Sequence, residues 1–249
     1  MRYFIKLAYN GTDYCGWQIQ PNAPSIQESL NEALSKILRE EIYVVGAGRT
    51  DTGVHAKQMY AHFETDQAIE TEHLAFRLNR FLPEAIAIQS IFPVNGDAHT
   101  RFSATSRSYE YWISQAKNPF LAAWSWQIEQ PLDVSAMNDC AKALLGEQDF
   151  TSFSKSGTQT ETNLCHVTET YWEKSGDLLI FHVSANRFLR NMVRAIVGTL
   201  VAVGQNKLDK AGFIELIEKK NRSSAGVSAP AHGLYLTKVD YPQSIYPHG

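Results

Sequence analysis

The sequence predicts a mixed α+β protein made of two ferredoxin-like halves with a shared, extended antiparallel sheet. The element order strand, helix, strand, strand, helix, strand occurs in residues 1–100 and again in residues 101–249. The composition, with 44% hydrophobic and 20% charged residues, is that of an ordinary globular protein. Because no glycine- and serine-rich linker separates the halves, we expect their sheets to be continuous.

The first half begins with a strand. Apolar and aromatic residues alternate with other residues over positions 3–9, and the turn dipeptide Asn10-Gly11 follows. Ser25 and Glu28 have the spacing of a capping box, and apolar residues recur at helical spacing over positions 26–38. The remaining elements of this half are predicted as strands over 42–45, 59–63 and 86–92, and a helix over 74–82 that ends at Pro83.

The second half repeats this order of elements without a visible repeat of sequence. Its elements are predicted as strands over 109–113, 167–172, 178–183 and 234–239, and helices over 137–145, 188–203 and 213–217. The turn Ser175-Gly176-Asp177 joins the two middle strands as a hairpin. We therefore expect an N-terminal domain over 1–100 and a C-terminal domain over 101–249.

The overall charge argues against a nucleic-acid partner. The chain has 23 Lys and Arg against 26 Asp and Glu, a net charge of −3. The excess of acid lies in the first half, so the net charge is an average over unlike parts. Three widely spaced cysteines are typical of a reducing cytosol, which predicts a cytoplasmic protein. The longest apolar stretch, over 195–204, is too short to span a membrane.

A glycine-rich turn that follows a predicted strand carries Arg49 and Asp51. Side chains at positions i and i+2 of an extended segment point the same way, so we expect the two to be neighbours. The guanidinium would favour the ionised carboxylate, which then serves as a nucleophile or base. The alternative is an Asp that caps a turn beside a surface Arg. Asp51-Thr52-Gly53 also matches the aspartic-protease triplet, but that chemistry needs two such carboxylates, and the sequence contains no second triplet.

A second candidate segment, residues 178–208, contains no acidic residue and carries Arg187, Arg190 and Arg194. Spacings of three and four residues place these arginines on one face of the helix predicted over 188–203, with Asn186 as its N-cap. Cations in a first helical turn oppose the helix dipole, and a bound phosphate would make them favourable. The sequence therefore predicts a phosphate-binding face, and a solvated surface with distant acidic partners is the alternative.

Basic and aromatic residues interleave over 100–112, where Tyr109 and Tyr111 share one face of a predicted strand. Such faces stack unpaired bases of RNA. Alternating aromatic residues are also common on the core side of a strand, and Tyr109 fits either role. The sequence has no metal-ligand spacing and no nucleotide-binding motif, so we expect no metal site.

Several segments resemble the tRNA pseudouridine synthase A family, and they occur in the family's order along nearly the whole chain. The active-site motif is matched by Gly48-Arg49-Thr50-Asp51-Thr52-Gly53-Val54-His55-Ala56. The other matching segments are Tyr9-Asn10-Gly11-Thr12-Asp13-Tyr14, Gly16-Trp17-Gln18, Arg101-Phe102-Ser103-Ala104, Phe150-Thr151-Ser152-Phe153, residues 186–194, and Gly233-Leu234-Tyr235-Leu236.

The resemblance implies an isomerase that converts uridines 38 to 40 in the anticodon stem-loop of tRNA to pseudouridine. It implies Asp51 as the catalytic nucleophile, with Arg49, Tyr109 and Arg194 also in the active site. It further implies a homodimer that uses no metal or organic cofactor. The residues expected to contact RNA are Tyr109, Arg107, Arg187, Arg190 and Leu234. A non-catalytic RNA-binding protein with two RRM-like halves is the alternative, although no RNP1-like run is present.

Overall fold

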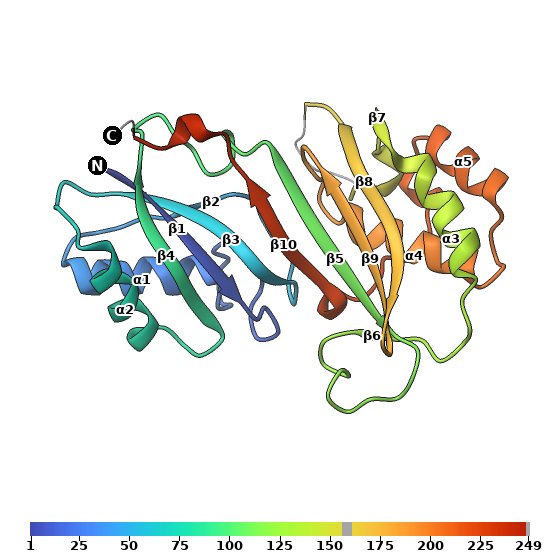
Figure 1. Cartoon of the computed structure of the whole chain (residues 1–249), viewed down its shortest axis with the longest axis horizontal. Coiled ribbons are helices and arrows are strands. Elements are labelled where there is room, and N and C mark those ends of the chain that lie inside the picture. Colours follow the sequence, from blue (N-terminus) through green and yellow to red (C-terminus); the bar gives the residue numbers. More distant parts are fainter. Residues whose placement is uncertain (156–160, 248–249) are drawn as a thin grey trace. The chain divides into compact units, whose positions relative to one another are not determined.

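The computed structural model describes residues 1–155 and 161–247, which form two compact units. The first unit contains Met1–Ser106 and Leu236–Gly249, and the second contains Arg107–Tyr235. Each unit consists of a β-sheet with helices packed against it (Figure 1). This arrangement confirms the mixed α+β fold class. Among the described residues, no helix has the length and apolar character needed to cross a membrane.

The first unit has a sheet in the strand order β4-β1-β3-β10, with the short strand β2 also paired to β3. Strand β1 pairs antiparallel with both β3 and β4. The elements of this unit are β1 (Arg2–Tyr9), α1 (Ile26–Leu38), β2 (Val45–Gly46), β3 (His55–Glu64), α2 (Thr71–Phe81), β4 (Ile86–Val94) and most of β10 (Leu234–Asp240). All of the predicted elements except the strand over 42–45 lie within a few residues of their predicted positions.

Helix α1 begins where the capping box predicts. The Ser25 hydroxyl accepts a hydrogen bond from the Glu28 amide at 3.2 Å, which satisfies one of the free N–H groups of the first turn. The helix buries Ile26, Leu30 and Leu34 on one face, as their spacing predicts.

Residues 42–44 do not form the predicted strand, because side chains of α1 bind their backbone. The Ser35 hydroxyl accepts from the Ile42 amide at 2.9 Å, and the Asn31 side chain accepts from the Val44 amide at 2.9 Å. Gln27 donates to the Val44 carbonyl at 2.8 Å. These groups replace the partners that a sheet would provide, so the strand β2 is only Val45–Gly46.

The C-terminal segment returns to the first unit, which differs from the predicted division of the chain at residue 100. The Tyr241 hydroxyl donates to the Thr100 carbonyl at 2.6 Å, and the Val239 amide donates to the Gln58 side chain at 2.8 Å. The Tyr241 ring also packs against Phe4 and Tyr60, with ring centroids 5.3 and 5.1 Å apart. These contacts cover the face of β1 that bears Phe4 and attach the end of the chain to its first strand.

The second unit has a sheet in the order β5-β9-β8-β7, with the short strand β6 beside β5. Strands β8 and β9 form the predicted hairpin, in which Gly176 takes a positive φ of 58°. The elements are β5 (Ser106–Ser114), β6 (Trp126–Gln127), α3 (Val134–Ala141), β7 (Gly146–Asp149), β8 (Leu164–Ser175), β9 (Leu178–Ala185), α4 (Met192–Gly204) and α5 (Lys210–Glu218). Among the strands and α-helices described in this unit, the sequence does not predict the short strands β6 and β7.

Helix α4 begins at Met192, so the prediction of a helix from residue 188 is wrong. Its N-cap is Asn191, with φ of 66°, and not Asn186. The Asn186 side chain instead accepts a hydrogen bond from the His166 amide of β8 at 2.9 Å. The Lys155 amide donates to the Arg190 carbonyl at 3.1 Å. These long-range bonds hold the segment before α4 in a non-helical conformation.

Candidate active site

The loop that carries Asp51 is held by the last residue of β1 and by the chain segment that follows this strand. The Tyr9 and Thr50 hydroxyls lie 2.9 Å apart, and the Trp17 amide donates to the Thr50 carbonyl at 3.2 Å. The Thr52 hydroxyl donates to the Cys15 carbonyl at 3.0 Å. Thr50 and Thr52, on the two sides of Asp51, are therefore fixed by groups far away in sequence. These contacts fix the backbone from which the Asp51 side chain extends.

Two glycines make this close approach possible. Gly16 has φ of +105°, and a Cβ atom added to it would lie 2.3 Å from the Thr50 carbonyl oxygen. A Cβ atom added to Gly11 would lie 2.0 Å from the Val54 carbonyl oxygen. Both glycines lie in the segments 9–14 and 16–18 that resemble the family, and their packing against residues 50–54 gives that resemblance a structural reason.

Gly16→Ala is expected to displace the loop that carries Asp51 and to destabilise the protein. The alanine would have to keep a positive φ, and its methyl group would push the Thr50 carbonyl away. Together these effects should lower the free energy of unfolding by about 1–3 kcal/mol. Thermal unfolding temperature and turnover should both decrease. The matched control is Gly96→Ala, since an added Cβ meets nothing within 4 Å there and φ is not positive. An unchanged unfolding temperature for Gly16→Ala would contradict this role of the glycine.

Asp51 is half-buried, whereas Arg49 is exposed. The Asp51 carbonyl accepts from the Val54 amide at 3.1 Å, so the backbone turns back immediately after the carboxylate. The contact of the Arg49 guanidinium with the Asp51 carboxylate, expected from the sequence, stays a prediction.

In the second unit, Tyr109 and Tyr111 have different surroundings although they share one face of β5. Tyr111 is completely buried, its hydroxyl donates to the Pro230 carbonyl at 2.8 Å, and burial raises the pKa of its phenol. Tyr109 is half-buried, and its ring meets the Phe188 ring edge-on with centroids 5.1 Å apart. Tyr111 is thus a core residue, and Tyr109 is the tyrosine that retains access to solvent.

The predicted RNA contacts Arg107 and Arg187 lie near Tyr109, at the end of β9 that adjoins the start of β5. Arg107 pairs with Ala185 in the sheet and donates to the Asn186 carbonyl at 2.9 Å. Arg187 and Arg190 follow in the non-helical segment before α4. The three predicted arginines therefore do not share one helix face, because only Arg194 is helical.

Arg194 is half-buried on the first turn of α4. Its Nε donates to the Ala229 carbonyl at 2.7 Å, and the Ala229 amide donates to the Arg194 carbonyl at 2.9 Å. The segment that supplies these bonds is itself packed closely on the helix, since a Cβ atom added to Gly198 would lie 1.9 Å from the Val227 carbonyl oxygen. The sequence gives no signal for this support. Leu234, the remaining predicted contact, is buried.

Clusters of metal-ligating side chains and the cysteine thiols are the other features from which a reactive site could be built. Among the described residues, no three His, Cys, Asp or Glu side chains gather in a group that fits a metal ion. The three cysteines are free, and burial raises the pKa of the Cys165 thiol to about 11. That thiol is protonated at neutral pH and is a poor nucleophile.

Comparison with known proteins gives matches over nearly the whole chain. The profile of a family described as tRNA pseudouridine synthase matches residues 6–103 and 140–242, which include parts of both units. A protein of Porphyromonas gingivalis named tRNA pseudouridine synthase A is 50% identical over 250 residues, covering 98% of this chain and 99% of that protein. Proteins with the same name from Parabacteroides distasonis and Bacteroides thetaiotaomicron are 49% and 48% identical, covering 99% and 98% of this chain and 98% and 92% of theirs.

Proposed function

We propose, because the chain belongs to the tRNA pseudouridine synthase family, that it modifies uridines 38, 39 and 40 in the anticodon stem-loop of tRNA. The reaction is the isomerisation of uridine to pseudouridine. The observation that carries this conclusion is the sequence identity of 48% and 49%, over nearly the whole chain, to relatives named for this activity. The specificity for positions 38 to 40 rests on the resemblance of the motifs around Asp51. The net charge of −3 is therefore a poor guide to the partner of this chain.

The reaction breaks one bond between the uracil base and the ribose and forms another bond between the same two groups. The bond from N1 of uracil to C1′ of ribose breaks, the base turns, and C5 bonds to C1′. C5 then loses its proton and N1 gains one, so the reaction has no net redox change. A carboxylate contributes by attacking the ribose, by attacking the ring, or by assisting elimination to a glycal. The target uridine must leave the base stack before any of these steps.

The roles proposed for the site residues follow from their chemistry. Asp51 is the nucleophile, on a loop fixed from both sides. Arg49 orients and stabilises the ionised carboxylate, and Arg194 supplies a second cation. Tyr109 stacks on the uracil or moves a proton from the ring. Its partial exposure and its support by Phe188 are compatible with both actions.

Arg49→Ala is expected to lose most activity, because Asp51 would lose the cation proposed to orient it. Arg49→Lys should restore only part of the rate, since an ammonium group cannot form the bidentate contact of a guanidinium. Single-turnover rates with bound tRNA measure both effects. Arg80→Ala, which removes an exposed arginine from α2, is the matched control and should be neutral. A near-native rate for Arg49→Ala would show that the proposed pair does not act in catalysis.

The RNA contacts that the resemblance suggests are Tyr109, Arg107, Arg187, Arg190 and Leu234, of which Leu234 is buried in this structure. If Arg187 and Arg190 neutralise phosphates, their removal should lower the affinity for all tRNAs by similar factors. Each substitution should also flatten the slope of the logarithm of the binding constant against the logarithm of the salt concentration by roughly 0.7–0.9. Arg194→Ala should instead slow turnover more than it weakens binding. Affinities over a salt series, with single-turnover rates, separate the two classes. An unchanged salt slope for Arg187→Ala and Arg190→Ala would identify that segment as solvated surface.

Two further features of the proposal concern the enzyme in the cell. The resemblance to the family supports a homodimer whose two subunits form the tRNA-binding cleft, and a cytoplasmic location where tRNA is available. Sedimentation at micromolar concentration tests the oligomeric state.

The direct test of the function is conversion of tRNA from a strain that lacks this activity, followed by mass spectrometry at positions 38, 39 and 40. Pseudouridine at other positions only would overturn the proposed specificity. Binding without any conversion would favour the RNA-binding alternative.

A further inference from the structure

Phe102 is a large apolar side chain that the fold leaves in solvent, since 75% of its surface is exposed. It follows Arg101 in the turn between β4 and β5. The Arg101 guanidinium carbon lies 5.5 Å from the centre of the Phe102 ring. The His99 ring also packs on it, with its centroid 4.4 Å from that of Phe102. The two neighbours make an exposed group of flat, polarisable side chains, which we call the Phe102 platform and define as His99, Arg101 and Phe102.

The other strongly exposed phenylalanines lack these neighbours. Phe76 and Phe120 are 63% and 85% exposed. Within residues 1–155 and 161–247, neither ring packs on a cation or on another aromatic ring. Phe81, which is 48% exposed, has the Lys36 Nζ atom 5.3 Å from the centre of its ring. Exposure and a neighbouring cation therefore also occur elsewhere in the chain, and the additional aromatic neighbour, His99, distinguishes Phe102.

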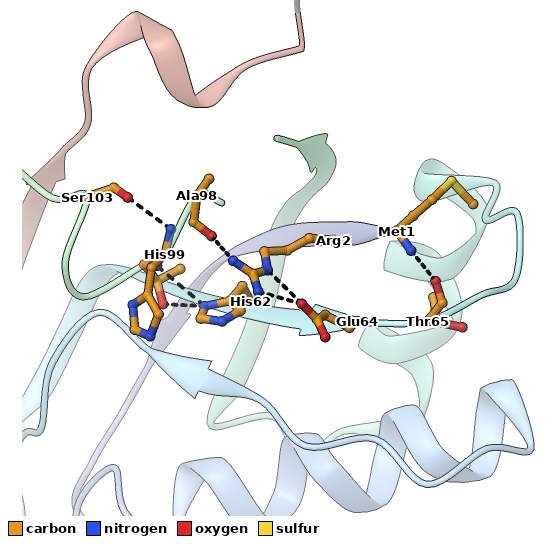
Figure 2. A network of polar contacts seen from close by, with 9 residues as sticks. Met1, Arg2, His62, Glu64, Thr65, Ala98, His99 and Ser103 are labelled. Carbon is orange, nitrogen blue, oxygen red and sulfur yellow. Dashed lines mark hydrogen bonds and ion pairs between the residues drawn. The ribbon is translucent and has the colours of Figure 1, made fainter. Parts of the chain in front are cut away.

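The turn that presents Phe102 is held rigidly from within. The Nδ1 atom of His99 accepts hydrogen bonds from the amides of Arg101 at 3.0 Å and Phe102 at 3.3 Å. The His99 amide donates to the Ser103 hydroxyl at 2.9 Å, as Figure 2 shows. The Ser103 amide donates to the His99 carbonyl at 2.8 Å. Burial, with the charges of Arg2 and Arg101, lowers the pKa of His99, which keeps Nδ1 available as an acceptor. An aromatic ring on a fixed backbone loses little entropy when it binds a partner.

The platform is also joined to the sheet and to the strand that leads into the Asp51 loop. The His99 ring lies beside the buried His62 ring of β3, as Figure 2 shows, and the two ring centroids are 4.7 Å apart. The Thr100 hydroxyl donates to the carbonyl of Val45, the first residue of β2, at 2.8 Å. Val45 lies six residues before Asp51 in the same unit. The turn that carries the platform is therefore hydrogen-bonded to β2, the short strand that leads into the Asp51 loop.

We propose that the Phe102 platform stacks on an unpaired base of the substrate tRNA. This inference rests on the proposed function and adds a binding residue to it. Aromatic rings beside a guanidinium form the kind of surface on which unpaired bases stack. The face of the exposed Phe102 ring can stack on a base and offers no hydrogen-bond donor to a phosphate. An RNA with splayed bases is the partner that the proposed substrate provides.

The test measures the affinity of the full-length protein for an anticodon stem-loop RNA. Phe102→Ala should weaken binding by roughly 5- to 150-fold, the range typical of one stacked base, with an unchanged salt slope. Phe102→Tyr and Phe102→Trp should bind like the wild type. Phe102→Leu, which keeps apolar bulk and loses the aromatic face, should behave like Phe102→Ala. Phe76→Ala is the matched control and should bind normally, as its ring lies exposed on α2 of the same unit.

The RNA itself supplies a second control. A duplex with the same stem and no loop has no unpaired base, so Phe102→Ala and the wild type should bind it equally. For Phe102→Trp, the indole emission should change on addition of the stem-loop at concentrations that match the measured affinity. All variants should keep the wild-type unfolding temperature, since the side chain is mostly outside the core.

Three results would overturn the proposal. They are equal affinity of Phe102→Ala and wild type for the stem-loop, full affinity of Phe102→Leu, and a Phe102→Ala variant that changes oligomeric state in sedimentation. The last would assign the ring to contact with a second copy of the chain. Failure of the proposed function is distinct from these, because it would appear as a wild-type protein that forms no pseudouridine.

Discussion

Asp51→Asn is expected to reduce pseudouridine formation by roughly 10⁴-fold or more, the scale on which removal of a nucleophile acts. The amide is nearly isosteric with the carboxylate, so the loop held by Thr50 and Thr52 should keep its conformation. Affinity for tRNA should stay within a few-fold of the wild-type value, because a nucleophile contributes to the transition state and not to ground-state binding. Single-turnover rates and binding isotherms on the same preparation measure both quantities.

The control for this substitution is Asp66→Asn, which neutralises an exposed acid in the same unit. It should leave both rate and affinity unchanged. Asp51→Ala should be as inactive as Asp51→Asn. Measurable multiple turnover by Asp51→Asn, with the substitution verified by mass spectrometry, would remove Asp51 from the chemistry.

Tyr109→Phe is expected to bind tRNA normally and to turn over about 100- to 10,000-fold more slowly, the size of effect that positioned acid–base groups contribute. The phenyl ring is sufficient for stacking on a base and for the edge-on contact with Phe188. The hydroxyl is required only if Tyr109 moves a proton. Tyr109→Leu should weaken both binding and turnover, because it lacks the aromatic face as well. Binding isotherms and single-turnover rates measure the two effects separately.

Tyr171→Phe provides the comparison for Tyr109, since Tyr171 is a partly exposed tyrosine on the same sheet. Loss of its hydroxyl should have no effect on rate. If Tyr109→Phe has full activity, the proton-transfer role is wrong and stacking is the role that remains.

Local signals in the sequence predict most of the fold. The capping box at Ser25 marks the start of α1 to the residue, and alternation over 3–9 marks β1. These elements agree with the structure because their determinants are neighbours in the chain. The start of α4 is different, since apolar residues at 188 and 189 continue the helical pattern that begins at Met192. The bond from the Lys155 amide to the Arg190 carbonyl opposes that pattern, and it comes from a distant segment.

Some features of the candidate site can likewise be predicted from neighbouring residues, and others depend on contacts between distant segments. The motif around Asp51 can be recognised because its residues are consecutive, and Tyr109 can be recognised as one member of an aromatic strand. The alternation of residues by itself cannot rank Tyr109 above Tyr111, because burial of Tyr111 depends on the segment that contains Pro230. The sequence also hides the Phe102 platform, in which a histidine three residues away orients the turn. Contacts that form only in the folded chain decide each of these cases.

The return of the C-terminal segment to the first unit has a consequence for synthesis of the chain. Bonds from Tyr241 to Thr100 and from Val239 to Gln58 close loops of 141 and 181 residues. As the ribosome produces the chain from its N-terminus, the unit that carries Asp51 starts first and is completed last. Until residues 236–249 emerge, the Phe4 face of β1 lacks its cover, and the edge of β3 lacks strand β10. The nascent first unit is thus incomplete during translation of the second, and contacts of such long separation form slowly.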